Sequence, residues 1–325
     1  MKPLSVYIHI PFCEKRCGYC DFVSCTQTQN IDEYLEYLCR EIRAFDFSDY
    51  DVKTIYIGGG TPSLLTPAQL ETVLKCLPVC HGEVTLEANP NSLTRVKCET
   101  YRALGINRLS LGVQSFDLDT LRDLGRLHDV KQAIAAIKLA HKYFDNLSID
   151  LIKDIPGHAF VTPSKEVLDM IQHISIYSLT KDDQCVIDTD EPVNLPTTFE
   201  RYEVSNYARK GYESQHNLVY WTGGEYIGFG AGAHSLLNNQ RFCNSNDILH
   251  YKRIEIEQRT AESKHNEEIM LGLRLRTGVA RTLLVGKDNE IKMLAEHGLV
   301  KVTPTHVIAT EAGLKVLNQI WLKLV

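Results

Sequence analysis

Three cysteines lie within the stretch HIPFCEKRCGYCDF, residues 9–22, directly after a run of strand-forming residues. Cys13, Cys17 and Cys20 have the spacing C-x3-C-x2-C. Clustered thiols in a long chain with a large core are more often metal or cluster ligands than disulfide partners. A [4Fe–4S] cluster has four irons, each usually held by a cysteine thiolate. One loop with three cysteines therefore predicts a cluster whose fourth iron stays open to a reactant.

The same three thiols are also compatible with a single zinc ion if His9 supplies the fourth ligand. The local spacing does not distinguish this zinc site from an open cluster. Under the zinc alternative, the protein is a zinc-stabilised interaction module without redox chemistry. The loop alone leaves both interpretations open.

Six short runs rich in β-branched residues alternate with segments of helical periodicity. This alternation predicts an α/β fold made of right-handed βαβ units with a parallel sheet. Because six units are fewer than the eight that close a barrel, we expect a partial (β/α)6 TIM-like barrel with a lateral opening. The expected strands are 4–10, 53–57, 83–87, 107–113, 147–152 and 173–179, and the expected helices are 31–45, 66–77, 94–104, 118–124, 129–144 and 163–171.

Polar motifs follow the ends of the predicted strands. The cysteine loop follows the first, GGGTP (58–62) the second, EANP (87–90) the third and GVQS (112–115) the fourth, while DLIKDIPG (150–157) overlaps the fifth. In (β/α) barrels the active site is built from the loops at this one face. We therefore expect the five motifs to surround one site.

Three of these strand ends carry hydrogen-bond acceptors, namely Glu87, Gln114 and Asp150. Such side chains suit the hydroxyl and ammonium groups of a ligand. Arg126, in LGRLH, suits a carboxylate. The glycine run of residues 58–60 lets a backbone edge approach the ligand closely.

The cysteine loop resembles that of the radical S-adenosylmethionine (SAM) superfamily, whose hallmark is CxxxCxxC with an aromatic residue before the last cysteine, here Tyr19. The resemblance implies that Cys13, Cys17 and Cys20 hold a [4Fe–4S] cluster. It also implies that SAM chelates the open iron and that an electron from the reduced cluster cleaves SAM to a 5′-deoxyadenosyl radical. By matching motif, the residues around SAM would be Tyr7, Tyr19, Gly59, Gly60, Thr61, Glu87, Gln114, Arg126 and Asp150.

Further motifs, including NRLSLGVQSFD, YEVSNYARKGYESQHNLVYW and YIGFGAGAHS, resemble the coproporphyrinogen III oxidase-like branch of the superfamily, and within it the heme-chaperone (HemW) group. The oxidase pattern has a further cysteine two residues after the third, whereas this chain has Phe22, as in the chaperone group. The HNxxYW box is tied to heme in that group. Its heme candidates here are His216, Asn217, Tyr220 and Trp221, with His234 as a second histidine.

The resemblance implies a heme-binding radical SAM protein that acts as a heme chaperone. The alternative is an oxygen-independent coproporphyrinogen III oxidase that converts propionates to vinyl groups by radical decarboxylation. If the protein is catalytic, it would be coproporphyrinogen dehydrogenase-like or SAM-cleaving. The implied partners are heme or porphyrin and an electron donor such as flavodoxin or ferredoxin. The resemblance does not identify the protein that accepts the heme. It is compatible with a transient contact with a membrane protein.

The composition of the 325-residue chain is that of an ordinary globular protein, with a net charge of −6. It shows no basic footprint for nucleic acid. No apolar run approaches the roughly 20 residues that span a bilayer. The start of the chain does not resemble a signal peptide. Together with the ten cysteines, these features predict a cytoplasmic protein.

Three units are expected along the chain: the radical SAM partial barrel in 1–180, a barrel extension with the HNxxYW box in 181–245, and a smaller, mostly helical C-terminal domain in 246–325. The last resembles a winged helix, yet it has no cluster of Lys and Arg, so a cap over the substrate opening is preferred. The stretches 181–200 and 276–290 are short for the family pattern.

Overall fold

The computed structural model describes residues 1–179 and 193–325. The beginning of the predicted 181–245 unit, and most of the short stretch 181–200, therefore lie outside the described residues. Across the two described ranges, no helix is both long enough and apolar enough to cross a bilayer.

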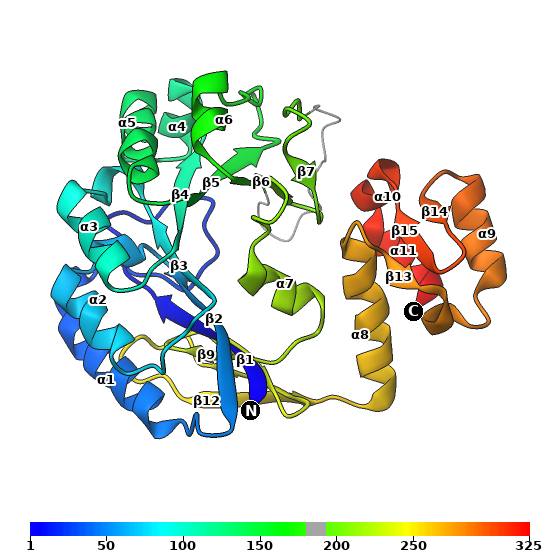
Figure 1. The fold of residues 1–325 in the computed structure, drawn as a ribbon, viewed down its shortest axis with the longest axis horizontal. Helices are drawn as coiled ribbons and strands as arrows, with labels where there is room; N and C mark the ends of the chain where they lie inside the picture. The colour runs from blue at the N-terminus through cyan, green and yellow to red at the C-terminus, as the bar shows by residue number, and fades with distance from the viewer. Residues whose placement is uncertain (180–192) are drawn as a thin grey trace.

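A curved parallel sheet with helices on its outer face forms the larger part of the molecule (Figure 1). The six predicted strands are present and are neighbours in the sheet, in chain order. They are β1 (Lys2–Ile10), β2 (Tyr50–Gly59), β3 (Glu83–Ala88), β4 (Arg108–Gln114), β5 (Asn146–Lys153) and β6 (His173–Ser178). The six predicted helices are α1 (Ile31–Ala44), α2 (Pro67–Leu74), α3 (Arg95–Ala103), α4 (Leu118–Asp123), α5 (Val130–His141) and α6 (Lys165–Met170). The predicted α/β fold with a partial (β/α)6 barrel is confirmed.

Local sequence explains why these elements begin where they do. Helix α2 starts with a capping box in which the Thr66 side chain accepts from the Gln69 amide, and Pro67 occupies the first helical position. Helix α5 starts with a second capping box, between Asp129 and Gln132. The strands are largely buried on both faces, but only one face is apolar: in β4, Leu109 and Leu111 alternate with the buried polar residues Arg108 and Ser110.

Further strands extend the sheet at both edges, and the whole sheet has twelve strands. Beside β1 lies β9 (Tyr226–Phe229), which is parallel to it, followed by β10 (His234–Leu237), β11 (Gln240–Asn244) and β12 (Arg253–Gln258). Beyond β6 lie β8 (Asn206–Ala208) and β7 (Glu200–Arg201). Strand β12 falls within the predicted unit 246–325 but pairs with β11 in the large sheet. Its exposed edge sequence, RIEIEQ, lacks the buried apolar pattern of the other strands.

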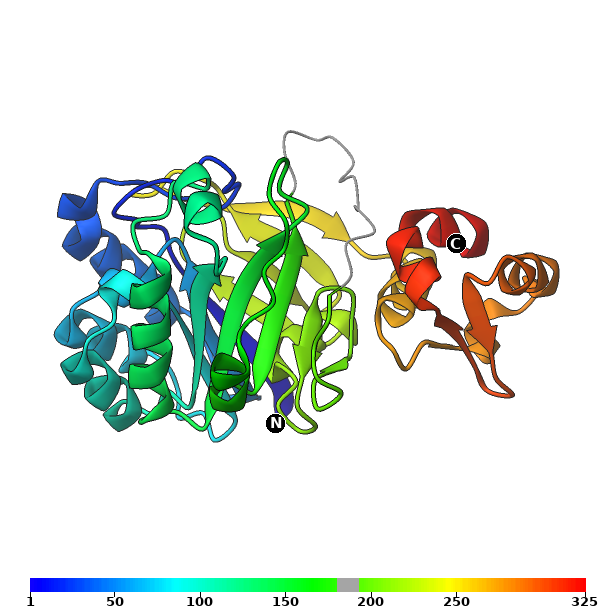
Figure 2. The same cartoon turned by 90° about the horizontal axis from the view of Figure 1, so that it is seen from above.

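A second unit with its own core lies to one side of the barrel (Figures 1 and 2). It begins with α8 (Ala261–Arg274), which contacts α7 and whose Arg274 forms an ion pair of 2.7 Å with Glu203. A three-stranded sheet follows, with Ile269, Leu273 and Val307 in the core. The other elements are β13 (Val279–Ala280), α9 (Asp288–Glu296), β14 (Val300–Val302), β15 (His306–Ala309), α10 (Glu311–Lys315) and α11 (Leu317–Leu324). The elements α9, β14, β15 and α10 follow one another as helix, strand, strand and helix, in keeping with the predicted resemblance to a winged helix.

The short helix α7 (Gln215–Trp221) lies inside the curve of the sheet, against the starts of the strands (Figure 1). The carboxylate of Glu83, at the start of β3, accepts hydrogen bonds from the backbone amides of Gln215 and His216. Glu83 also pairs with Arg108, 3.9 Å away, and both side chains are almost fully buried. One buried carboxylate thus joins α7 to the sheet.

We expect Glu83→Ala to destabilise the barrel strongly. The substitution leaves Arg108 buried without its partner and removes the acceptor for the first amides of α7, and breaking such a buried pair costs about 3–5 kcal/mol. Urea unfolding followed by circular dichroism should show a lower midpoint. The matched control is Glu71→Ala, which removes an exposed i,i+4 pair with Lys75 and should leave the midpoint unchanged. Equal midpoints for the two variants would contradict this account.

Candidate functional site

A cavity of about 520 Å³ lies at the carboxyl ends of the parallel strands, and we call it the cluster cavity. All the described residues that line it precede residue 180. Every predicted cluster and SAM residue except Tyr7 is among them. They are Cys13, Cys17, Tyr19, Cys20, Gly59, Gly60, Thr61, Glu87, Gln114, Arg126 and Asp150.

Backbone hydrogen bonds fix the start of the cysteine loop. The Cys13 amide donates to the Cys25 carbonyl at 2.9 Å, and the Cys25 amide donates to the Pro11 carbonyl at 2.7 Å. The Thr61 hydroxyl, at the end of β2, donates to the Cys13 sulfur at 3.7 Å. The first thiol is thus held against the glycine-rich strand end.

Arg126 joins the cysteine loop to the ends of β3 and β4. One guanidinium nitrogen lies 3.7 Å from Cys17 Sγ and 3.3 Å from the Tyr19 hydroxyl. The other donates to Asn89 Oδ1 and to the Gly112 carbonyl, each at 2.7 Å. Its buried Nε has no partner within the described residues, so a donor remains for a ligand in the cavity.

Burial raises the pKa of the Cys13 thiol and that of the Cys20 thiol. These sulfurs therefore keep their protons unless a metal replaces them, because metal ligation requires the thiolate. Ligation would therefore release protons from these thiols. All three cysteines line the same cavity, as ligands of one cluster would have to.

Gly60 forms a backbone cradle for the first thiol. A Cβ at this position would lie 2.8 Å from the Phe12 carbonyl oxygen and 3.0 Å from Cys13 Sγ. Its amide donates to the Ile10 carbonyl at 2.8 Å. The glycine therefore allows β2 to approach the cysteine loop more closely than any other residue would.

Glu87 is a buried carboxyl group at the end of β3. The Tyr56 hydroxyl donates to it at 2.6 Å and the Gly59 amide at 3.1 Å. Burial nevertheless raises the pKa of Glu87 to about 7, and the nearby Asp150 carboxylate adds to the shift. Glu87 therefore changes charge near neutral pH, in a cavity suited to a cationic ligand.

Two further predicted SAM residues lie at the ends of β4 and β5. The Ser110 hydroxyl donates to Asp150 at 3.2 Å, and burial raises the pKa of the Asp150 carboxyl. Gln114 has a φ of 70°, a left-handed conformation that side-chain-bearing residues rarely adopt, next to a shift in the register of β4 and β5. Strained backbone of this kind clusters at binding sites.

Tyr7 and His9 do not line the cluster cavity. The Tyr7 hydroxyl lies 2.9 Å from His9 Nδ1, and His9 Nε2 lies 2.8 Å from the Val23 carbonyl oxygen. Both ring nitrogens of His9 are therefore engaged within the protein. Among the described side chains, no three of His, Cys, Asp or Glu are placed to hold one metal ion. Because both of its ring nitrogens are engaged, His9 offers no free nitrogen to a zinc ion, which counts against the zinc alternative with His9 as fourth ligand.

A second cavity, of about 510 Å³, adjoins the first, and we call it the aromatic cavity. Asp21 and Phe22 line both cavities. Its other lining residues include Tyr7, His9, Tyr220, Trp221, Tyr226, His234, Arg241 and, from α8, Glu267 and Leu271. The C-terminal unit predicted as a cap thus borders this second cavity.

The predicted heme residues are divided between the aromatic cavity and the interior. Tyr220, Trp221 and His234 line the cavity, whereas His216 is only 1% exposed. The amide of Asn217 donates to the Ser214 hydroxyl that caps α7. The HNxxYW box therefore faces two ways, with its histidine inward and its aromatic rings toward the cavity.

Several lining residues of the cluster cavity are absent from the set predicted from sequence. Asn89 donates to the Thr61 hydroxyl and accepts from Arg126. Tyr56 orients Glu87 from within β2. Their positions could have been found from the strand-end motifs, since Asn89 lies in EANP and Tyr56 lies two residues before GGGTP. Ile152, Tyr177 and Leu179 also line this cavity.

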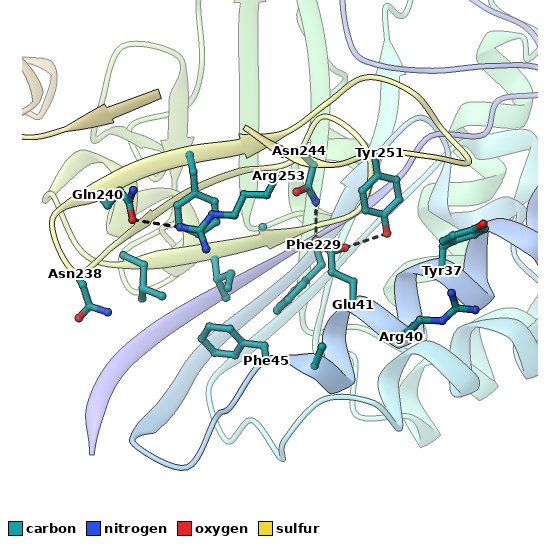
Figure 3. Close-up of a pocket in the computed structure, with 15 residues that line it drawn as sticks. Tyr37, Arg40, Glu41, Phe45, Phe229, Asn238, Gln240, Asn244, Tyr251 and Arg253 are labelled. Atoms are coloured by element: carbon teal, nitrogen blue, oxygen red, sulfur yellow. Dashed lines mark hydrogen bonds between the residues drawn. The ribbon is translucent and has the colours of Figure 1, made fainter. Parts of the chain in front are cut away.

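A third cavity, of about 600 Å³, lies on the outer side of the sheet between α1 and the strands β9 to β11 (Figure 3). It contains none of the predicted site residues. Glu41 accepts hydrogen bonds there from Asn244 Nδ2 at 2.6 Å and from the Tyr251 hydroxyl at 3.0 Å. It also accepts from the Gly230 amide, so this carboxylate fastens α1 to the added strands.

The sequence and the fold have known counterparts. The model of the radical SAM superfamily matches residues 7–160. The heme chaperone HemW of Bacillus subtilis is 33% identical, over 98% of this chain and 98% of the relative. The heme chaperone HemW of Lactococcus lactis is 36% identical, over 86% of this chain and 83% of the relative. This chain belongs to the HemW family of radical SAM proteins.

Solved structures agree with the fold. The coproporphyrinogen III oxidase HemN of Escherichia coli, described as a radical SAM enzyme, superposes with a TM-score of 0.79 at 21% identity, over 99% of this chain and 90% of HemN. Membership of the HemW family implies a [4Fe–4S] cluster and SAM. A reduced cluster at this site would supply an electron for the cleavage of SAM. The cysteine loop would hold the cluster, while Arg126 and Glu87 would contact the ligand.

We expect Gly60→Ala to impair cluster binding, because its Cβ would collide with backbone atoms of the cysteine loop. Overpacking of this kind costs about 1–3 kcal/mol, so the affinity for the cluster should fall about tenfold or more. Iron and sulfide content after anaerobic reconstitution measures the effect. The control is Gly18→Ala in the same loop, where an added Cβ has no neighbour within 4 Å. Equal iron content in the two variants would contradict the proposed cradle.

We expect the affinity for SAM to rise with pH because Glu87 gains its charge near pH 7. Its ionised fraction grows from about one tenth at pH 6 to about three quarters at pH 7.5, and SAM is cationic. Titration calorimetry of cluster-loaded protein should therefore show several-fold tighter binding at the higher pH. Glu87→Gln keeps the shape of the side chain and should flatten this dependence. The same slope in both proteins would show that another group is responsible.

Proposed function

We propose that this protein is a heme chaperone, which binds heme beside its cluster and SAM site and transfers it to an acceptor protein. The observation that carries the proposal is that Asp21 and Phe22 line both the cluster cavity and the aromatic cavity. A cavity of about 510 Å³ lies in the range of small-ligand and cofactor sites. Its aromatic lining suits a flat, apolar macrocycle. The HemW name of the relatives supports the same function.

Phe22 favours the chaperone over the coproporphyrinogen III oxidase. The oxidase pattern has a cysteine where this chain has Phe22, and phenylalanine binds no metal. The Phe22 ring is 65% exposed, at the boundary of the two cavities. Exposed aromatic side chains of this size favour binding of an apolar partner. The position is therefore better suited to contact with a macrocycle than to electron transfer through a thiol.

The expected cluster implies an electron donor as a further partner, and the free thiols indicate the cellular compartment. Reduction of the cluster would come from a small electron-transfer protein such as a flavodoxin or ferredoxin. The nine described cysteines are all free thiols. Free thiols in this number are typical of a reducing compartment, so we place the protein in the cytoplasm.

Titration of the full-length protein with ferric heme should give saturable binding with a shifted Soret band. Phe22→Ala should weaken binding about tenfold, because stacking on an aromatic ring is worth about 0.5–1.5 kcal/mol beyond burial alone. Val79→Ala is the control, since Val79 is an apolar residue that is 78% exposed and lines neither cavity. An absence of saturable binding would refute the proposal. Formation of protoporphyrinogen from coproporphyrinogen III, with reduced cluster and SAM, would instead favour the oxidase.

A further inference from the structure

Three histidines lie near the aromatic cavity, and they differ in what their ring nitrogens contact. His9 and His216 each have both nitrogens engaged by neighbouring groups of the protein. His234, at the start of β10, is exposed and lines the cavity. Within residues 1–179 and 193–325, no hydrogen bond to the His234 ring is found. Of the three imidazoles, His234 is therefore the one with a nitrogen available to a ligand.

His216 is held in the interior by contacts on every side. Its Nδ1 lies 2.7 Å from the Thr54 hydroxyl and its Nε2 lies 2.8 Å from the Tyr220 hydroxyl. Its backbone amide donates to the buried carboxylate of Glu83. To reach a metal in the cavity, His216 would have to leave both ring partners unpaired and pull α7 from the sheet.

The neighbours of His216 explain what it does instead. Its hydrogen bond with Tyr220 fixes the position of that ring, which then meets the Tyr226 ring edge to face, with centroids 4.6 Å apart. Arg274 of α8 lies over the Trp221 ring at 4.0 Å. The two aromatic rings of the HNxxYW box are thus fixed as one wall of the cavity.

The surroundings of His234 suit an iron ligand. Partial desolvation lowers the pKa of its imidazole, and the positive charge of Arg241 lowers it further, so both effects favour the neutral ring. Neutral imidazole is a common axial ligand of heme iron. Cys243 is directly opposite His234 in the β10–β11 pair, so the two side chains point to the same face. Cys243 is therefore the competing ligand to be tested.

We infer that His234 is the axial ligand of heme iron in the aromatic cavity, and that His216 is a positioning residue that holds the Tyr220 wall. The inference rests on the proposed heme-chaperone function, which it deepens by naming the site and its ligand. In this arrangement the macrocycle lies between Phe22 and the Tyr220–Trp221 wall. The heme is then separated from the cluster cavity by the shared residues Asp21 and Phe22 alone.

The test is a titration of full-length variants with ferric heme, followed by the Soret band and by electron paramagnetic resonance of the ferric iron. His234→Ala should lose the signature of histidine ligation, and added free imidazole should restore it. His216→Ala should keep the signature while its affinity falls by up to about tenfold, the effect of one lost hydrogen bond. His250→Ala, whose side chain is 68% exposed outside the cavity, should match the wild type. His234→Tyr should replace the histidine signature with that of a phenolate and serves as a second variant if His234→Ala is unstable.

The outcomes separate the two proposals. If the wild-type protein fails to bind heme saturably, the chaperone function itself is refuted. If it binds heme but His234→Ala is unchanged, only the assignment of the ligand is overturned. Loss of the wild-type spectroscopic signature in Cys243→Ala would overturn the assignment of His234 and identify Cys243 as the ligand. Loss of that signature in His216→Ala, with rescue by imidazole, would overturn the assignment and identify His216.

Discussion

The buried carboxylate of Glu83 is the interaction on which the aromatic cavity depends, because it holds the helix that carries Tyr220 and Trp221. It accepts hydrogen bonds from the first amides of α7 and balances the buried charge of Arg108. A helix start buried without such an acceptor would leave its amide groups unpaired, which is costly in the interior. With Glu83 in place, α7 occupies the inside of the sheet and turns Tyr220 and Trp221 toward the aromatic cavity. Glu83, at the start of β3, thus helps to determine the shape of the aromatic cavity.

The cluster cavity combines buried groups of opposite charge. Glu87 and Asp150 lie at the ends of β3 and β5, and burial raises the pKa of each. Arg126 lies among them and reaches the cysteine loop. A ligand that carries both an ammonium group and a carboxylate offers a partner to each of these groups. The arrangement therefore favours a zwitterionic ligand over a simple cation or anion.

The parallel half of the fold could be predicted from sequence because six short strand-forming runs alternate along the chain with segments of helical periodicity. The cluster cavity followed from it, since parallel strand ends meet at one face. The added strands β10 to β12 could not be assigned in this way, because they lie at an edge and β12 is exposed. Sequence alone could not separate burial of His216 from heme ligation, since the Glu83 carboxylate that fixes α7 lies 131 residues before Ser214. Periodicity describes a helix but not the distant partner that positions it.

Phe22 belongs to both cavities, and this has a thermodynamic consequence. Any molecule that shifts this ring while occupying one cavity changes the free energy of occupying the other. Linkage requires the effect to be reciprocal: if SAM alters the retention of a second ligand by some factor, that ligand alters the retention of SAM by the same factor. If SAM in one cavity moved this ring, a single side chain at the boundary would couple occupation of the second cavity to the cofactor.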